Sequence, residues 1–140
     1  MSVLTTIAVG YDGSPDAEAA VRWSLKLGNA NDSTVVAVHA VGLLEHLHAS
    51  FSRVVTPPAL VAIAKELHFD EKRLYWRVDD GDACSVLLRA SLAPLNADLI
   101  VVGTRGLARR AGTLLGSTSL ELAEHATTPV VIVPSGYVDR

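Results

Sequence analysis

The sequence of 140 residues contains a single cysteine, Cys84, which excludes a disulfide bond within the chain. No apolar run approaches the roughly 20 residues that a membrane-spanning helix needs, and no signal-like segment precedes the first strand pattern. Basic residues are also few, because 12 Lys and Arg stand against 15 Asp and Glu and leave a net charge of −3. Binding to the phosphate backbone of a nucleic acid needs a basic face. We therefore expect a cytoplasmic protein whose partners include neither nucleic acids nor membranes.

Two common nucleotide-binding motifs are missing from the sequence as well. There is no lysine loop of the form G-x4-G-K-[ST], so the lysine that holds phosphates in many ATPases is absent. No G-x-G-x-x-G follows the first strand pattern, which disfavours a dinucleotide-dependent oxidoreductase. What remains is a chain with 49% apolar and 19% charged residues. This composition is typical of a globular protein, and the length predicts one domain that spans residues 1–140.

Short strand patterns alternate with longer helix patterns along the chain. Strands are expected at residues 5–10, 34–41, 74–78, 98–103 and 129–133, and helices at residues 15–28, 59–68, 83–93 and 118–125. Such alternation predicts an α/β fold with a single open, mostly parallel five-stranded sheet and helices on both faces. Ligands of such sheets bind outside the carboxyl ends of the strands, where the strand order reverses.

Capping residues mark several of the expected helix ends. Ser14 is placed to cap the first helix, and Gly28 is a reasonable stop for it. A turn at residues 79–81 precedes Asp82, which is placed to cap the third helix, and Pro94 prevents that helix from continuing. The helix starts are therefore predicted from side-chain caps, and the helix ends from a glycine and a proline.

The most informative motif consists of glycines at fixed spacing after the fourth strand pattern. Gly103 ends that strand, Gly106 follows after two intervening residues, and Gly116 with Ser117 opens the last helix pattern. Glycine lets a ligand approach the backbone closely, and the N–H groups at the start of a helix favour an anion. The motif therefore predicts a nucleotide whose ribose lies near Gly103 and whose phosphates lie near Gly116 and Ser117.

The glycine spacing G-x2-G-x9-G-[S/T] resembles the ATP-binding motif of the universal stress protein family. The opening V-G-Y-D-G-S at residues 9–14, the pair Gly81-Asp82 and the runs at residues 97–103 and 128–133 are similar to that family too. The resemblance implies a Rossmann-like fold of the adenine nucleotide alpha hydrolase type. It also implies ATP, AMP or cyclic AMP as the ligand, Mg²⁺ as a bridging ion, and a homodimer that pairs the last strands, Val130–Val133.

The same resemblance assigns contacts to residues at the strand ends and at the start of the last helix. Asp12 would lie near the adenosine and help to hold the metal ion, and Ala40 would offer main-chain groups to the edge of the adenine. Gly103 and Gly106 would allow close approach of ribose and phosphate. The candidate cofactor-binding residues are Gly10, Tyr11, Asp12, His39, Ala40, Gly103, Thr104, Arg105, Gly106, Gly116, Ser117, Thr118 and Ser119.

Simpler interpretations stand beside several of these roles. Asp12 is also placed to cap the turn into the first helix, because Asp-Gly is a common turn dipeptide, although its position at the end of a strand modestly favours a ligand role. His39 suits a structural role better than a catalytic one. Arginines usually carry solvated surface charges, but we expect at least one of Arg105, Arg109 and Arg110 to contact phosphate.

Three functions remain open from the sequence. The first is a regulatory protein in which bound nucleotide biases dimerisation or the choice of partner, the second is slow ATP hydrolysis, and the third is a dimeric interaction module that has lost its nucleotide. The intact glycine motif favours the first. The chain departs from the family at residues 43–72, which look short, and at Ala40, where a larger aliphatic residue is common. Both departures bear on how the pocket is closed.

Overall fold

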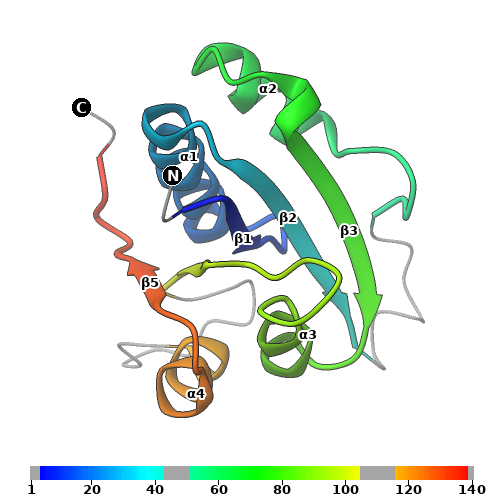
Figure 1. The fold of residues 1–140 in the computed structure, drawn as a ribbon, viewed down its shortest axis with the longest axis vertical. Helices are drawn as coiled ribbons and strands as arrows, with labels where there is room; N and C mark the ends of the chain where they lie inside the picture. Colours follow the sequence, from blue (N-terminus) through cyan, green and yellow to red (C-terminus); the bar gives the residue numbers. More distant parts are fainter. Residues whose placement is uncertain (1–3, 43–50, 105–115, 139–140) are drawn as a thin grey trace.

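The computed structural model describes residues 4–42, 51–104 and 116–138, and these residues form one parallel sheet (Figure 1). The strand order is β3-β2-β1-β4-β5, and every adjacent pair is parallel. The strands are β1 (Thr6–Gly10), β2 (Thr34–Val41), β3 (Leu74–Asp80), β4 (Leu99–Gly103) and β5 (Val130–Val133). This architecture confirms the predicted open parallel α/β fold.

Helices cover both faces of the sheet, as the sequence predicts. The described residues form α1 (Pro15–Asn31), α2 (Pro58–Glu66), α3 (Ala83–Arg89) and α4 (Ser117–His125), with a short 3-10 turn, η2 (Glu71–Arg73), before β3. Ile7 and Val9 of β1 belong to the core beneath α1 and α2, whereas Ala8 belongs to the core beneath α3 and α4. Because successive side chains of a strand point to opposite faces, a central strand covered on both sides must be apolar throughout.

The first helix begins where its cap predicts but ends later than expected. The Ser14 hydroxyl accepts a hydrogen bond from the Ala17 N–H at 3.1 Å. The predicted stop at Gly28 is wrong, because the helix continues to Asn31 and ends at Asp32, which has a left-handed φ of 53°. A Cβ at Gly28 would lie 3.0 Å from the ring of Phe69. Gly28 therefore allows close packing within the helix and does not terminate it.

The third helix is shorter than predicted, and the strand before it is longer. Strand β3 continues through Asp80, so the expected turn at residues 79–81 is reduced to a bend at Gly81, where φ is 134°. Helix α3 ends at Arg89 and does not reach residue 93. The Ala90 N–H bonds to the carbonyl three residues earlier, which tightens the chain. Steric exclusion of helical backbone before Pro94 explains why the helix cannot resume.

The cap of α3 makes stability depend on pH in the acid range. The Asp82 carboxylate accepts the Ser85 N–H at 3.0 Å, and this hydrogen bond lowers the pKa of Asp82. A lowered folded-state pKa adds stability above the unfolded value of about 3.9 and loses it as the pH falls through the folded value. We expect Asp82→Asn, which keeps an accepting oxygen, to match the wild type at pH 7. Urea midpoints between pH 6 and pH 2.5 should fall less for this variant, and an identical fall would contradict the assignment.

The strand order reverses between β1 and β4, which places a crevice at their carboxyl ends. From β1 the chain proceeds to β2 on one side of the sheet, and from β4 it proceeds to β5 on the other. Gly10 and Gly103 end these two strands. Open α/β sheets bind their ligands at such a reversal. Within the described parts of the chain, no helix has the length and apolar character required to cross a membrane.

Candidate functional site

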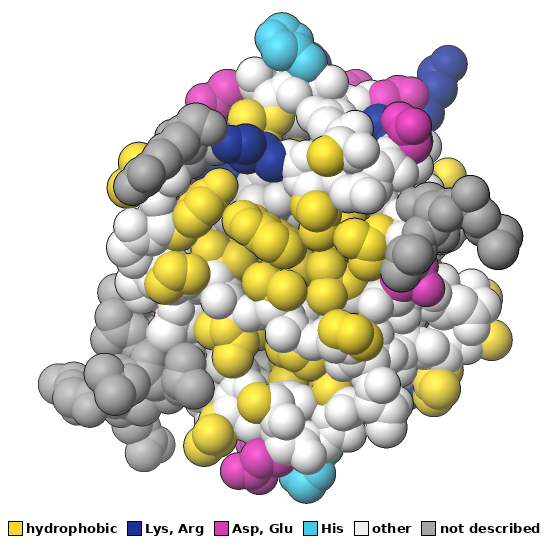
Figure 2. All heavy atoms as spheres, turned by 60° about the vertical axis from the view of Figure 1, so that its left-hand side comes forward, with side chains coloured by type: hydrophobic (Ala, Val, Ile, Leu, Met, Phe, Trp, Pro, Cys, Tyr) yellow, Lys and Arg dark blue, Asp and Glu magenta, His cyan; other side chains and the backbone are white. Residues whose placement is uncertain are grey.

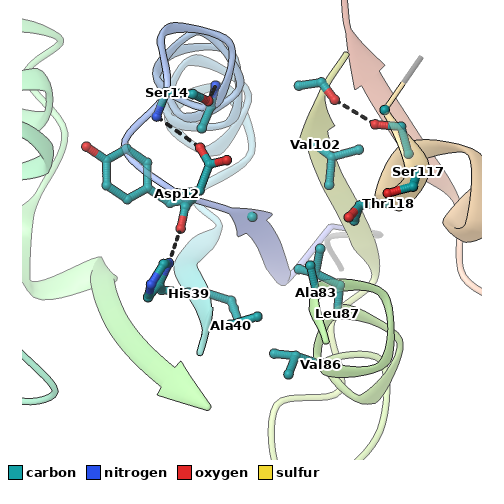
Figure 3. Close-up of a pocket in the computed structure, with 17 residues that line it drawn as sticks. Asp12, Ser14, His39, Ala40, Ala83, Val86, Leu87, Val102, Ser117 and Thr118 are labelled. Carbon is teal, nitrogen blue, oxygen red and sulfur yellow. Dashed lines mark hydrogen bonds between the residues drawn. The ribbon is translucent and has the colours of Figure 1, made fainter. Parts of the chain in front are cut away.

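A cavity of about 340 Å³ lies at this reversal (Figure 3). Small-molecule sites span roughly 300–1,000 Å³, so the cavity is large enough for a compact ligand. The predicted residues that line it are Gly10, Tyr11, Asp12, His39, Ala40, Gly103, Gly116, Ser117, Thr118 and Ser119. Thr104 is not part of the lining. The remaining predicted residues, Arg105 and Gly106, lie outside the described residues, as do Arg109 and Arg110.

One half of the cavity is apolar, and its main wall comes from a helix that the sequence analysis did not assign to the site. Ala83, Val86 and Leu87 of α3 lie opposite Ala40 of β2 (Figure 3), and Val38 of β2 also lines the cavity. The three α3 residues have the spacing i, i+3 and i+4, which places them on one side of a helix. That spacing, directly after a strand that ends at the ligand edge, is the signal that could have identified them.

The other half of the cavity is formed by the start of α4, which lacks a side-chain cap. Its N-cap residue is Gly116, which has no side chain to accept a hydrogen bond from the first turn. The first N–H groups of a helix have no partner within the helix. Ser14 caps α1 and Asp82 caps α3. Of the described helices that begin at this cavity, α4 therefore offers its N–H groups and positive dipole end to a ligand.

Asp12 follows β1 and lines the cavity, and it also holds a turn. Its carboxylate accepts the Ser14 N–H at 2.9 Å, so the turn-capping role considered above is present in the structure. Among the described residues, no three His, Cys, Asp or Glu side chains gather as a metal site. Mg²⁺ is usually held by one or two carboxylates together with waters and substrate phosphates. Asp12 fits that mode of binding but could not hold the ion without a phosphate ligand.

Tyr11 and His39 border the cavity with buried rings that pack among aromatic side chains. The Nδ1 atom of His39 donates to the Tyr11 carbonyl at 2.8 Å, since a carbonyl oxygen can only accept. The His39 ring stacks on Trp76 with 6.2 Å between ring centroids and meets Phe51 edge-on. Burial raises the pKa of Tyr11, and the carboxylates of Glu18 and Asp12 add to this. This packing supports the structural role expected for His39.

Gly103 is surrounded by protein as well as by the cavity. A Cβ at this position would lie 2.6 Å from the carbonyl oxygen of Asp16, at the start of α1. Real Cβ atoms essentially never approach backbone so closely. The Asp16 side chain is itself buried and accepts a hydrogen bond from Ser135 at 3.1 Å. The glycine is therefore required for packing of α1 against β4, whatever the cavity holds.

The model of the universal stress protein family matches residues 4–134, nearly the whole chain. The chain belongs to the universal stress protein family. Universal stress protein Rv2623 of Mycobacterium tuberculosis is 32% identical over 154 residues, covering 91% of this chain and 46% of that protein. A universal stress protein of Mycolicibacterium smegmatis is 26% identical over 147 residues, covering 91% and 47%. The chain thus spans about half the length of the curated relatives it matches.

Solved universal stress proteins share the fold. One solved in complex with cAMP is 26% identical, has a TM-score of 0.63, and is matched over 97% of this chain and 100% of its own. Another, from Burkholderia pseudomallei, is 26% identical with a TM-score of 0.60, over 96% and 98%. UspA from Lactobacillus plantarum is 18% identical with a TM-score of 0.69 over 93% and 97%, which shows the fold alone.

This universal stress protein has a helix in the segment that we expected to depart from its family. Part of residues 43–72 forms α2, whose buried Leu60, Ile63 and Ala64 pack in the core shared with α1. Phe51 and Ser52 precede it and approach the β1 edge of the site: the Phe51 ring packs against Tyr11, and the Ser52 carbonyl accepts from the Trp76 indole. The described part of this segment therefore supports one side of the cavity through aromatic packing.

Proposed function

We propose that this protein binds an adenine nucleotide, with ATP as the leading candidate, in the cavity between β1 and β4. The observation that carries the proposal is the uncapped start of α4 facing an apolar wall across one cavity. An apolar wall suits a base, and open helix N–H groups suit phosphates. The related universal stress protein solved with cAMP supports the same ligand class.

The two halves of the cavity give each part of the nucleotide a place. We place the base against Ala40 and the α3 wall, and the ribose beside Gly10 and Gly103, which line the cavity where β1 and β4 end. Phosphates then meet the N–H groups of residues 117 and 118. Asp12 would supply a carboxylate ligand to a Mg²⁺ ion that the phosphates also bind.

A regulatory dimer is the function in which we place this binding. Strand β5 pairs with β4 along one edge, and its residues Val130, Val131 and Ile132 are only half-buried. Figure 2 shows a broad apolar area on the side of the molecule that carries β5. Pairing of β5 between two copies would cover this edge, and an unpaired strand edge is a template for association. We propose that bound nucleotide biases this pairing or the choice of another partner.

Thermal unfolding of the purified protein with and without ATP, AMP and cyclic AMP, each with and without Mg²⁺, tests the proposal. Ligand at about a hundred times its dissociation constant adds roughly 2.7 kcal/mol to stability. An upward shift that ranks the three nucleotides supports the site. No shift with any of them would leave the dimeric interaction module as the remaining function.

Replacing Ser117 with glutamate should separate phosphate binding from folding. Ser117 is exposed in the first turn of α4, where a carboxylate stabilises a helix by about 0.3–1 kcal/mol but repels a bound phosphate. We expect affinity for ATP to fall at least tenfold, equal to about 1.4 kcal/mol, while the unliganded protein unfolds at the same or a higher temperature. Isothermal titration of ATP and adenosine measures this effect.

Adenosine and a neutral variant serve as the controls for that replacement. Adenosine carries no phosphate, so its affinity should be unchanged in Ser117→Glu, and Ser117→Ala should bind ATP within a few-fold of the wild type. Equal losses for ATP and adenosine in the glutamate variant would refute the placement of phosphates at α4.

A further inference from the structure

Thr104 follows β4 directly, and its side chain contacts the neighbouring edge strand instead of the cavity. The Thr104 hydroxyl donates to the carbonyl oxygen of Val133 at 2.9 Å. The backbone register pairs Gly103 with Val133, the last residue of β5. The hydroxyl therefore extends the β4–β5 pairing beyond the last pair of backbone partners. It fixes the end of an edge strand that has no second neighbour within the described sheet.

The main chain of the same residue holds the start of α4. The Gly116 N–H donates to the Thr104 carbonyl at 2.8 Å. The buried Ser119 hydroxyl donates to the Gly103 carbonyl at 2.8 Å. These two bonds tie the first turn of α4 to the end of β4, although many residues separate them in sequence. Thr104 thus touches the anion-binding end of the cavity through its carbonyl and the edge strand through its hydroxyl.

We infer that Thr104 is a positioning residue that couples occupancy of the cavity to the β5 edge; this inference rests on the proposed nucleotide binding. A phosphate bound to the first turn of α4 restrains Gly116, and the Gly116 N–H restrains the Thr104 main chain. The Thr104 hydroxyl then restrains Val133 and with it the end of β5. Because coupling between sites is reciprocal, covering the β5 edge tightens nucleotide binding by the same factor.

The coupling role makes a prediction that a merely structural threonine does not. A threonine that only stabilises the fold would, on replacement, weaken β5 equally with and without nucleotide. If Thr104 couples the two sites, replacing it would abolish the difference in the stability of β5 between the nucleotide-bound and the nucleotide-free protein. Thr104→Val keeps the shape of the side chain and removes the hydroxyl, whereas Thr104→Ser keeps the hydroxyl. Thr34→Val, at the start of β2 and away from the cavity, is the matched control.

Amide hydrogen exchange of residues 130–133, with and without saturating ATP and Mg²⁺, tests the inference, together with self-association by sedimentation. In the wild type and in Thr104→Ser and Thr34→Val, we expect ATP to slow exchange and strengthen self-association at least fivefold, the lower end of typical allosteric coupling. In Thr104→Val, ATP should still bind within a few-fold of the wild type while both effects disappear. The inference is overturned if ATP binds the wild type without changing β5, or if Thr104→Val keeps the full effect. Absence of ATP binding to the wild type is a different result, because it defeats the proposed function itself.

Discussion

Replacing Gly103 with alanine should destabilise the protein by about 3 kcal/mol, the upper end of the usual cost of overpacking a core. The added Cβ would lie 2.6 Å from the carbonyl oxygen of Asp16 and 2.7 Å from its carbonyl carbon. Both atoms belong to backbone, so no rotamer change can relieve the overlap, and α1 must shift away from β4. Urea unfolding in the absence of any nucleotide measures the effect.

Two other glycines calibrate this prediction. A Cβ at Gly136 would meet no atom within 4 Å, so Gly136→Ala should be close to neutral. A Cβ at Gly10 would lie 3.1 Å from a terminal carbon of Leu87, which can move, so Gly10→Ala should cost less than Gly103→Ala. If Gly103→Ala were as stable as Gly136→Ala, the close contact with Asp16 would be wrong and the glycine would serve the ligand alone.

Replacing Ala83 with tryptophan should strongly weaken binding of every adenine compound while leaving the fold intact. Ala83 is the first residue of α3, lines the apolar half of the cavity and is only partly buried. An indole there would occupy the space that we assign to the base, so ATP, AMP and adenosine must all compete with it. We expect each to bind at least a hundredfold more weakly, equal to about 2.7 kcal/mol. Isothermal titration with the three ligands measures the loss.

The ligands that lose affinity distinguish Ala83→Trp from the variant at the start of α4, Ser117→Glu. Ser117→Glu should weaken ATP and spare adenosine, whereas Ala83→Trp should weaken both. Ser85→Trp, on the exposed side of the same helix, controls for the bulk of the indole and should bind normally. Unchanged adenosine affinity in Ala83→Trp would contradict the placement of the base against the α3 wall.

The parts of this structure that could be predicted from sequence depend on short-range chemistry. The buried strands are continuous apolar or β-branched runs, and β2 has the predicted bounds, Thr34–Val41. Ser14 and Asp82 cap their helices as expected. In each case the side-chain oxygen accepts a hydrogen bond from the N–H three residues later, so the interaction depends only on neighbouring sequence. The edge of the sheet that carries the cavity could be predicted from the strand ends alone, since parallel strands bring their carboxyl ends together.

The parts that could not be predicted depend on contacts between segments far apart in the sequence. Gly28 has the composition of a helix stop, but Phe69 and Val35 pack against it and the helix continues. Gly103 has the spacing of a ligand-binding glycine, yet its closest neighbour is Asp16. In both cases the local sequence shows only that the backbone has no side chain at that position. Only the folded structure shows which distant segment packs against the glycine in the space that a side chain would occupy.

The position of β1 in the sheet has a consequence for synthesis of the protein. β1 leaves the ribosome before β4, and its pairing with β2 can form early, yet its other neighbour is β4, where Ile7 pairs with Leu99. Domains begin to fold as the chain emerges, so one edge of β1 must wait until β4 has been made. During that interval its backbone presents an open template for other chains. The crevice between β1 and β4 therefore forms only after β4 has emerged, and a nascent chain cannot be stabilised there by ligand until β4 and the start of α4 have been translated.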